Sequence, residues 1–446
     1  MARINAQETL AQLIAASRAA GADAADALFV ESVASSISYR LGKLEDAERA
    51  EANDLGLRVF VGQKVAFVSS TDFSRDALAQ LPERAVAMAR LAPEDKYAGL
   101  APRERLASQF PSLDLEDANE PSTEALVALA RESEAAAMAV PGVTNSEGGG
   151  ASFSRTAITL ATSAGFYGSY AGTNHGISVV VLAGEGTLME RDYDQASARH
   201  KSDLRTAADI GRSAGERAVR RLNPRKVKSQ AVPIVYDPRV AGGLLGHFAG
   251  AISGASIARG VSFLKDLLGK EVFQPSVTIV DDPHRIRGLR SKPFDGEGVA
   301  NGRRNLVDRG VLSTWLLDCA SAKQLGLSTT GHASRGTGGP PSPSATNLYM
   351  EAGALSPDAL IADIKEGFYV TELIGMGVNS VTGDYSRGAA GFWIQNGAIA
   401  YPASEITIAG NLKDMFRNLT AANDLEFRYG INAPTLRVEG MTVAGA

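Results

Sequence analysis

Helical and alternating hydrophobic patterns follow one another along the first 95 residues. Apolar residues recur at helical spacing from about Thr9 to Ala19 and from Ser74 to Arg90, where Ser74 is of a type that caps helix N-termini. Between these helices, period-two alternation in the runs DALFVES, SISYRL, LGLRVFV and VAFVSST predicts strands arranged in hairpins. These patterns predict a first α+β unit over residues 1–95.

A second α+β unit is predicted over residues 120–228. It follows a proline-rich, charged stretch, 92–121, that has no periodicity and therefore suggests a domain boundary. The unit contains a helix near Thr123 to Ala139, hairpin strands, and a helix from about Asp203 to Leu222. Segments 56–78 and 176–204 share the order strand, glycine turn, strand, helix, so an internal duplication is one interpretation.

The third unit, residues 229–446, is predicted to be mostly β. A buried strand ends at Asp237, and the pair Asp237–Pro238 is typical of a helix start. Hairpin turns are predicted at Asp308–Gly310 and at Asn396–Gly397. The loop TTGHASRGTGGPPSPSAT, 329–346, is expected to be mobile, or ordered only by a partner. The fold class is therefore α+β, with two N-terminal units of helices and hairpins followed by a β-rich domain that contains a buried glycine-rich helix.

Composition narrows the functional class. The 446 residues include 45 Lys+Arg and 50 Asp+Glu, for a formal net charge of -5, which favours neither a nucleic-acid binder nor a membrane-surface protein. The basic cluster that ends the helix near residue 222 is best explained as a solvated helix end. The longest uncharged run, 240–258, has few strongly apolar residues, so we expect a buried helix and no membrane span.

The cysteine content and the N-terminal sequence indicate the cellular compartment in which the protein is found. Cys319 is the single cysteine, which excludes an intrachain disulfide. The first 21 residues resemble an amphipathic helix and lack the pattern of a signal peptide. We therefore expect a cytoplasmic protein.

The glycine-rich stretch GGLLGHFAGAISG, 242–254, raises the question of a metal site. Gly242, Gly246, Gly250 and Gly254 recur every fourth residue, and each costs about 1 kcal/mol relative to alanine in a helix. This cost predicts a close neighbour along the stripe: either a packed backbone or an approaching peptide or active-site wall. His247 is the one histidine of this helix, and a lone histidine on an apolar helix is usually a core residue.

Other catalytic patterns are weak. No pair among the five histidines has the spacing of zinc ligands. Ser262 and Lys265 match S-x-x-K without the companion motifs. The carboxylates of DDPHR and FDGEG, among them Asp281, Asp295 and Glu297, occur in turn compositions. The residues alone therefore predict an architecture without visible catalytic chemistry.

Several longer motifs resemble the TldD/PmbA family, and specifically its PmbA (TldE) branch. They are RDYD at 191–194, FDGEGVANGRRNLVDRGVLSTWLLD, the block TGDYSRGAAGFWIQNGAIAYPASEITIAGNL at 382–412, and the glycine-rich helix. The resemblance covers nearly the whole chain. It implies relatedness to a zinc metallopeptidase, TldD, whose ligands are two histidines in H-E-x-x-x-H on this same helix and a cysteine late in the C-terminal domain.

At the positions implied by this resemblance, the metal ligands are missing. Gly246 and Ala251 stand where the two histidines would be, and His247 stands where the glutamate would be. Segment 372–380, where the cysteine would fall, contains none. The resemblance therefore implies no metal and no catalytic residue in this chain. As residues that line a cavity or contact a peptide, we predict His247, Asp384, Tyr385, Arg387 and Trp393.

The functional hypothesis is a non-catalytic PmbA/TldE-type subunit. The resemblance implies a heterodimer with a zinc-containing TldD-like partner that cleaves unfolded peptides, processes a peptide antibiotic and degrades an antitoxin, without nucleic acid or membrane. The family's older name, modulator of DNA gyrase, need not imply DNA contact. Two alternatives remain: a homodimer that binds peptides without cleaving them, and a hydrolase with a non-metal nucleophile such as Ser386 beside Asp384 and Arg387.

Overall fold

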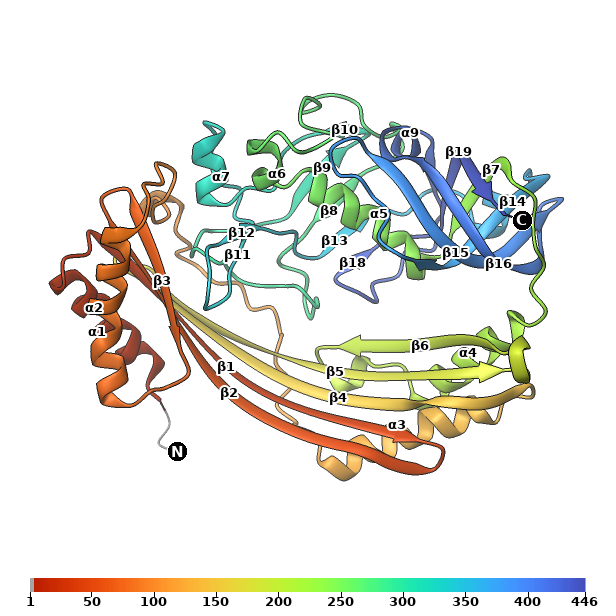
Figure 1. The fold of residues 1–446 in the computed structure, drawn as a ribbon, viewed down its shortest axis with the longest axis horizontal. Helices are drawn as coiled ribbons and strands as arrows, with labels where there is room; N and C mark the ends of the chain where they lie inside the picture. Colours follow the sequence, from red (N-terminus) through yellow and green to blue (C-terminus); the bar gives the residue numbers. More distant parts are fainter. Residues whose placement is uncertain (1–3, 446) are drawn as a thin grey trace.

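The computed structural model describes residues 4–445 and shows a long, curved antiparallel sheet that lies against a second, β-rich layer (Figure 1). The curved sheet is built from the first half of the chain, and the second layer from the rest. The predicted α+β class is confirmed.

Six strands form the curved sheet in the order β3-β2-β1-β4-β5-β6, and all neighbours are antiparallel. They are β1 (Ala24–Arg40), β2 (Lys43–Val61), β3 (Lys64–Ser70), β4 (Val143–Thr162), β5 (Tyr167–Ala183) and β6 (Glu190–Ala198). Strands β1 and β4 pair from Asp26↔Thr162 to Tyr39↔Gly149. The two N-terminal units therefore share one sheet.

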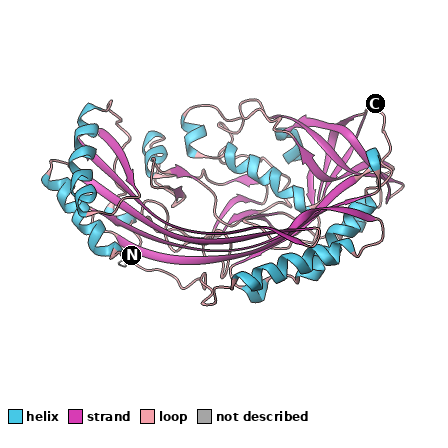
Figure 2. Cartoon of the chain, turned by 60° about the horizontal axis from the view of Figure 1, so that its bottom comes forward, coloured by secondary structure: helices cyan, strands magenta, loops and turns pink. Residues whose placement is uncertain are grey.

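Two helices from each unit cover this sheet, one pair toward each end (Figures 1 and 2): α1 (Ala6–Ala19), α2 (Arg75–Leu91), α3 (Thr123–Met138) and α4 (Ala207–Arg220). Leu10 and Leu13 of α1 share a core with Phe29 of β1, and Ile210 of α4 shares one with Val179 of β5. Each unit has the order helix, three strands, helix, so the predicted repetition of element order is confirmed.

The prediction of separate strands at DALFVES and SISYRL is wrong, because both belong to the single strand β1. Its partner β2 contains the charged run KLEDAERAEA, whose side chains are exposed. Such a run has no buried face to mark it as a strand, and pairing with β1 holds it in place. The two strands turn at Leu41 and Gly42, both at positive φ.

The boundary segment 92–121 connects the two layers. Apart from a short 3₁₀ turn, η1 (Arg103–Arg105), it is irregular. Its Ala107 N–H donates to Gly298 O at 2.9 Å, and its Leu115 O accepts from Thr173 N at 2.9 Å. The ring of Phe110 packs against that of Phe294, with centroids 5.1 Å apart. The segment is therefore held between the curved sheet and the C-terminal domain.

The C-terminal domain contains a closed barrel. Its strands follow the order β16-β15-β14-β7-β19, and β16 also pairs with β19, which closes the ring. The barrel strands are β7 (Gln230–Tyr236), β14 (Glu366–Ile374), β15 (Asp384–Gln395), β16 (Ala398–Asn411) and β19 (Leu436–Ala444), with β17 (Leu419–Ala421) beside β19. The turn between β15 and β16 has positive φ at Asn396 and Gly397, as predicted.

A five-stranded sheet of order β10-β9-β8-β13-β18 lies next to the barrel. Helix α5 (Pro238–Ala251) contacts strands of both. The remaining elements are β8 (Ile279–Asp281), β9 (Arg304–Asp308), β10 (Val311–Leu312), β11 (Ala333–Ser334), β12 (Ser342–Pro343), β13 (Leu348–Met350), β18 (Ile431–Asn432), α6 (Gly254–Ala258), α7 (Cys319–Gln324), α8 (Pro357–Ile361), α9 (Leu412–Arg417), η2 (Gly186–Leu188) and η3 (Lys201–Asp203).

Loop 329–346 packs against the rest of the chain, so the expectation that it is mobile or needs a partner is wrong. Its Arg335 reaches the N-terminal unit and donates to Asp26 at 2.6 Å. A Cβ built on Gly56 would clash with the backbone of Thr337, so the two backbones touch. The loop lacks large apolar residues, yet its backbone, Arg335 and polar side chains such as His332 and Thr346, which both contact Asp281, give it buried contacts.

The uncharged run 240–258 is divided between α5 and α6. Within residues 4–445, no helix is long and apolar enough to cross a membrane.

Candidate functional site

Helix α5 starts where the sequence predicts. Asp237 caps it, since its Oδ1 accepts the Arg239 N–H at 2.9 Å, and Pro238 occupies the first turn. One face of the helix is buried against the barrel and the neighbouring sheet. The buried residues of this face are Ala241, Leu244, Leu245, Phe248 and Ala251.

The opposite face of α5 lacks large apolar side chains. Gly243, Gly246, His247 and Gly250 follow the spacing i, i+3, i+4, i+7 and so share one side of the helix. Apart from its chain neighbours and the backbone of the helix itself, a Cβ built on any of these glycines would meet no heavy atom of residues 4–445 within 4 Å. We call these four residues the open glycine face.

The expected close neighbour along the glycine stripe is therefore only partly present. Gly242 is packed, because a Cβ there would lie 3.0 Å from Ile431 O. Gly254 is also packed, against Ser321, but it belongs to α6. For Gly246 and Gly250 the close-packing interpretation is wrong, and their faces are open to an incoming group.

Two residues of β15 lie near His247 on this side of the barrel. The rings of His247 and Tyr385 meet edge to face, with centroids 6.0 Å apart and planes at 76°. Burial and the positive charge of Arg387 both lower the pKa of His247. The imidazole is therefore uncharged at neutral pH. Arg387 is held by its Nε, which donates to Ile374 O at 3.3 Å.

Tyr385, the ring beside His247, lies next to Tyr236 in the buried core. Tyr385 is 2% exposed, and its hydroxyl has no hydrogen-bond partner among the described residues. The Tyr236 hydroxyl lies 3.5 Å from Met441 Sδ. Burial raises the pKa of both phenols, so neither supplies a phenolate base near neutral pH.

The other two predicted lining residues are placed elsewhere. Asp384 is exposed and fixes a turn: its carboxylate accepts from Thr382 Oγ1 at 2.6 Å and from Asn411 Nδ2 at 3.1 Å. These hydrogen bonds lower the pKa of Asp384. Trp393 lies in the barrel core. The structure thus brings together His247, Tyr385 and Arg387, and keeps Asp384 and Trp393 away from them.

The residues around α5 do not fit a zinc ion. A tetrahedral site needs several imidazole, thiolate or carboxylate ligands. The helix offers one imidazole, and the nearby charge is the cationic Arg387. Ala251, at one of the implied ligand positions, is packed in the core. Across residues 4–445, no group of three or more His, Cys, Asp or Glu side chains is placed to hold a metal.

The remaining nucleophile and acid candidates have structural contacts. The Ser262 hydroxyl donates to Ala251 O at 2.6 Å and accepts from Leu264 N at 3.0 Å. Asp295 accepts backbone N–H groups of Glu297, Val299 and Ala333. The sequence interpretation of Asp295 as a turn residue agrees with these bonds.

A buried charge cluster was missed by the sequence analysis. Asp26 of β1 pairs with Arg58 of β2 and with Arg335 of the loop, and Arg58 lies 3.7 Å from Glu297. All four side chains are at most 5% exposed. Burial raises the pKa of Glu297 to about 7. These residues are far apart in the sequence, and no local motif joins them.

Family models match three consecutive parts of the chain. They are PmbA/TldA metallopeptidase domain 1 over residues 25–89, the central domain over 116–222 and the C-terminal domain over 229–445.

Individual proteins match over nearly the same length. Metalloprotease PmbA of Escherichia coli O157:H7 is 40% identical over 95% of this chain and 92% of its own. A PmbA homologue of Haemophilus influenzae is 38% identical over 92% and 90%. Among solved structures, a candidate modulator of DNA gyrase from Bacteroides thetaiotaomicron has a TM-score of 0.91 at 27% identity, and it covers 100% of this chain and 100% of its own. TldE of Thermococcus kodakarensis has a TM-score of 0.88 at 20% identity, and it covers 98% of this chain and 100% of its own.

Proposed function

The chain belongs to the PmbA/TldD metallopeptidase family, and on that premise we propose that it is the non-catalytic PmbA/TldE-type subunit of a two-chain peptidase. Its partner is a TldD-like subunit that carries H-E-x-x-x-H and zinc. The substrates of the assembly are unfolded peptides. This chain supplies part of the surface along which they approach the partner's metal.

The observation that carries this proposal is the state of α5. Of the two positions where the resemblance places histidine ligands, Gly246 is open and Ala251 lies in the core. At the glutamate position, His247 is half-buried and adjacent to a tyrosine and an arginine. A single imidazole beside a positively charged guanidinium is poorly suited to hold a metal cation.

The open glycine face supports a role in peptide approach. Glycines without packed neighbours let another backbone come closer than any side chain would allow. Arg387 contributes a positive charge at this face, which suits peptide carbonyl and carboxylate oxygens. Ile374, the last residue of β14, and Met376, just after it, are 59% and 90% exposed and add apolar surface near Arg387.

Association with the partner is the first test. The chain and a TldD-type subunit from the same organism are purified separately, mixed, and analysed by size-exclusion chromatography and native mass spectrometry. We expect a complex with one copy of each chain. Separate elution of the two chains would contradict the proposal; if this chain then bound peptides as a dimer of itself, the homodimer alternative would replace it.

A further inference from the structure

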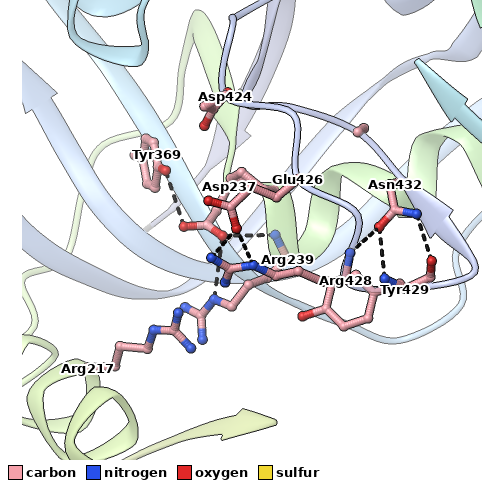
Figure 3. A pocket seen from close by; sticks show the side chains of 11 residues that line it. Arg217, Asp237, Arg239, Tyr369, Asp424, Glu426, Arg428, Tyr429 and Asn432 are labelled. Atoms are coloured by element: carbon pink, nitrogen blue, oxygen red, sulfur yellow. Dashed lines mark hydrogen bonds and ion pairs between the residues drawn. The ribbon is translucent and has the colours of Figure 1, made fainter. Parts of the chain in front are cut away.

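A polar cavity of about 260 Å³ lies where the middle unit meets the C-terminal domain, at the first turn of α5 (Figure 3). We call it the seam cavity. Its walls come from α4, the start of α5, β14 and the segment 424–433. The lining residues used in the argument are Arg217, Asp237, Arg239, Asp424, Arg428 and Tyr429.

The acidic groups of the seam cavity are already engaged. Asp237 accepts from Arg239 N through Oδ1 and from Tyr369 Oη through Oδ2, at 2.9 and 3.2 Å. Asp424 accepts from Thr435 N and Thr435 Oγ1 at 2.9 and 2.7 Å. Glu426 accepts from Arg428 Nε at 2.5 Å. These carboxylates hold the walls together.

The arginines, in contrast, retain unused N–H groups. Arg239 has an 8% exposed side chain and donates through Nη1 to Asp192 at 2.8 Å, but its Nε has no hydrogen-bond partner among the described residues. That Nε lies 3.5 Å from Asp237 Oδ1, outside hydrogen-bonding geometry. Arg217 contacts Asp194 at 2.9 Å and Tyr193 O at 3.3 Å, both through Nη1. Its other nitrogens make no hydrogen bond within residues 4–445.

Two further features of the seam cavity favour the binding of an acceptor or an anion. Within the described residues, the Tyr429 hydroxyl makes no protein hydrogen bond, and it lines the same space. The first turn of α5, a helix of 14 residues, places the positive end of its dipole at the cavity wall. Planar guanidinium groups with free N–H bonds match the two oxygens of a carboxylate.

We propose that the seam cavity is a carboxylate-binding site, and that its ligand is the C-terminal carboxylate of a peptide. The carboxylate oxygens accept from Arg217, from Nη2 of Arg239 and from Nη1 of Arg428, whose Nε and Nη2 contact Glu426, and the Tyr429 hydroxyl donates as a fourth group. No bond is made or broken. The proposal concerns this chain alone, so its failure and the failure of the two-chain assembly are separate results.

A neighbouring cavity explains why the carboxylate belongs to a peptide. This cavity, of about 210 Å³, shares Tyr429 and Asn432 with the seam cavity. Ile286 and Phe427 line it and are 62% and 45% exposed, among arginines of which Arg285 stacks on the Phe427 ring, so a partly apolar surface is available next to the carboxylate position. A peptide whose terminus lies in the seam cavity can place its preceding side chain there, whereas a free small carboxylate cannot use this surface.

The test compares three probes by isothermal titration calorimetry on the full chain. They are N-acetyl-Ala-Leu-Ala with a free carboxylate, the same peptide as its C-terminal amide, and sodium acetate. We expect the acid to bind at least tenfold more tightly than the amide and than acetate. Equal affinity for acid and amide would overturn the carboxylate site. Acetate binding as tight as the acid peptide would overturn the assignment to a peptide terminus.

Matched arginine variants locate the site. Arg428→Gln and Arg217→Gln each remove one donor and leave the buried Arg239 pair intact, and Asp194 keeps its 2.8 Å contact with Arg205. Both should weaken binding of the acid peptide at least fivefold. Arg212→Gln is the control, because Arg212 lies on the same helix but is exposed and pairs with Asp209. An equal loss in the control, or no loss in the two variants, would contradict the location.

Discussion

His247 and Tyr385 meet edge to face, with ring centroids 6.0 Å apart, at the place where a related peptidase helix would carry its catalytic glutamate. The contact joins α5 to the barrel strand β15. It gives His247 an aromatic neighbour and places the guanidinium of Arg387 near the imidazole. His247 thus presents an uncharged imidazole on the open glycine face, beside an aromatic ring and a guanidinium.

Larger side chains on the open glycine face should leave the fold stable but should lower peptide cleavage. Gly246→Ala and Gly246→Leu both remove a helix glycine, so each should keep or raise the free energy of unfolding, by up to about 1 kcal/mol. In a mixture with the TldD-type subunit, the leucine variant should lower peptide cleavage at least tenfold, because it fills the space beside His247. The alanine variant should change it less than twofold. Cleavage unchanged by leucine would exclude this face from the peptide path.

The pKa of His247 should respond to Arg387. Burial is the larger cause of the lowered pKa and Arg387 the smaller, so Arg387→Gln should raise the pKa while leaving it below the ordinary value of about 6.5. Histidine NMR titration, with His247→Gln to assign the signal, measures it. A pKa that does not move in Arg387→Gln would show that the guanidinium does not act on this ring.

The lowered pKa of His247 also predicts how the stability of the folded state depends on pH. The unfolded chain takes up the proton first as pH falls, so the folded state loses stability below about pH 6.5 and through the folded pKa. In His247→Gln this part of the acid destabilisation should be absent. Urea denaturation at several pH values compares the two proteins.

Glu297→Gln should stabilise the protein at alkaline pH. The pKa of this carboxyl is about 7 in the folded chain, compared with an ordinary value of 4.5. The carboxyl therefore contributes fully to the free energy of unfolding below pH 4.5, and this contribution is lost as the pH rises through 7. Glutamine mimics the protonated form, and at pH 8 the variant should exceed the native chain by about 3 kcal/mol. The difference should vanish near pH 4.5. Glu45→Gln, at an exposed position of β2, is the control and should show no such trend.

The buried pair of Asp26 with Arg335 should connect the two layers energetically. Asp26→Asn leaves Arg58 and Arg335 without their shared carboxylate, which should cost about 3–5 kcal/mol of stability. Limited proteolysis should then cut loop 329–346 faster. Glu120→Gln removes an exposed partner of Arg49 and should cost less than about 0.5 kcal/mol. Equal effects of the two changes would mean that the buried cluster does not hold the loop.

How far the sequence predicted this structure depended on local signals. Asp237 and Pro238 predict the start of α5, and Asn396–Gly397 predicts a hairpin turn. Both predictions hold because helix capping and turn formation depend on only a few neighbouring residues. The charged run of β2 has no such signal, since its conformation comes from pairing with β1. Likewise, Arg335 pairs with Asp26 across 309 positions, and only the folded chain brings them together.

The candidate site was predictable in part for the same reason. The resemblance located α5 and β15, but alternation along β15 does not reveal the register shifts in its pairing with β14 and β16, or which side chains face the helix. His247, Tyr385 and Arg387 meet, whereas Asp384 stabilises a turn and Trp393 packs in the core. Nor did periodicity indicate that Gly246 and Gly250 face open space rather than a packed neighbour.

The most direct measurement is zinc content by elemental analysis together with cleavage of an unstructured peptide, for this chain alone and after mixing with a TldD-type subunit. The account predicts no bound zinc and no cleavage for the chain alone, and cleavage in the mixture with zinc in the partner. Stoichiometric zinc and cleavage by this chain alone would contradict the account, because α5 would then hold a working metal site.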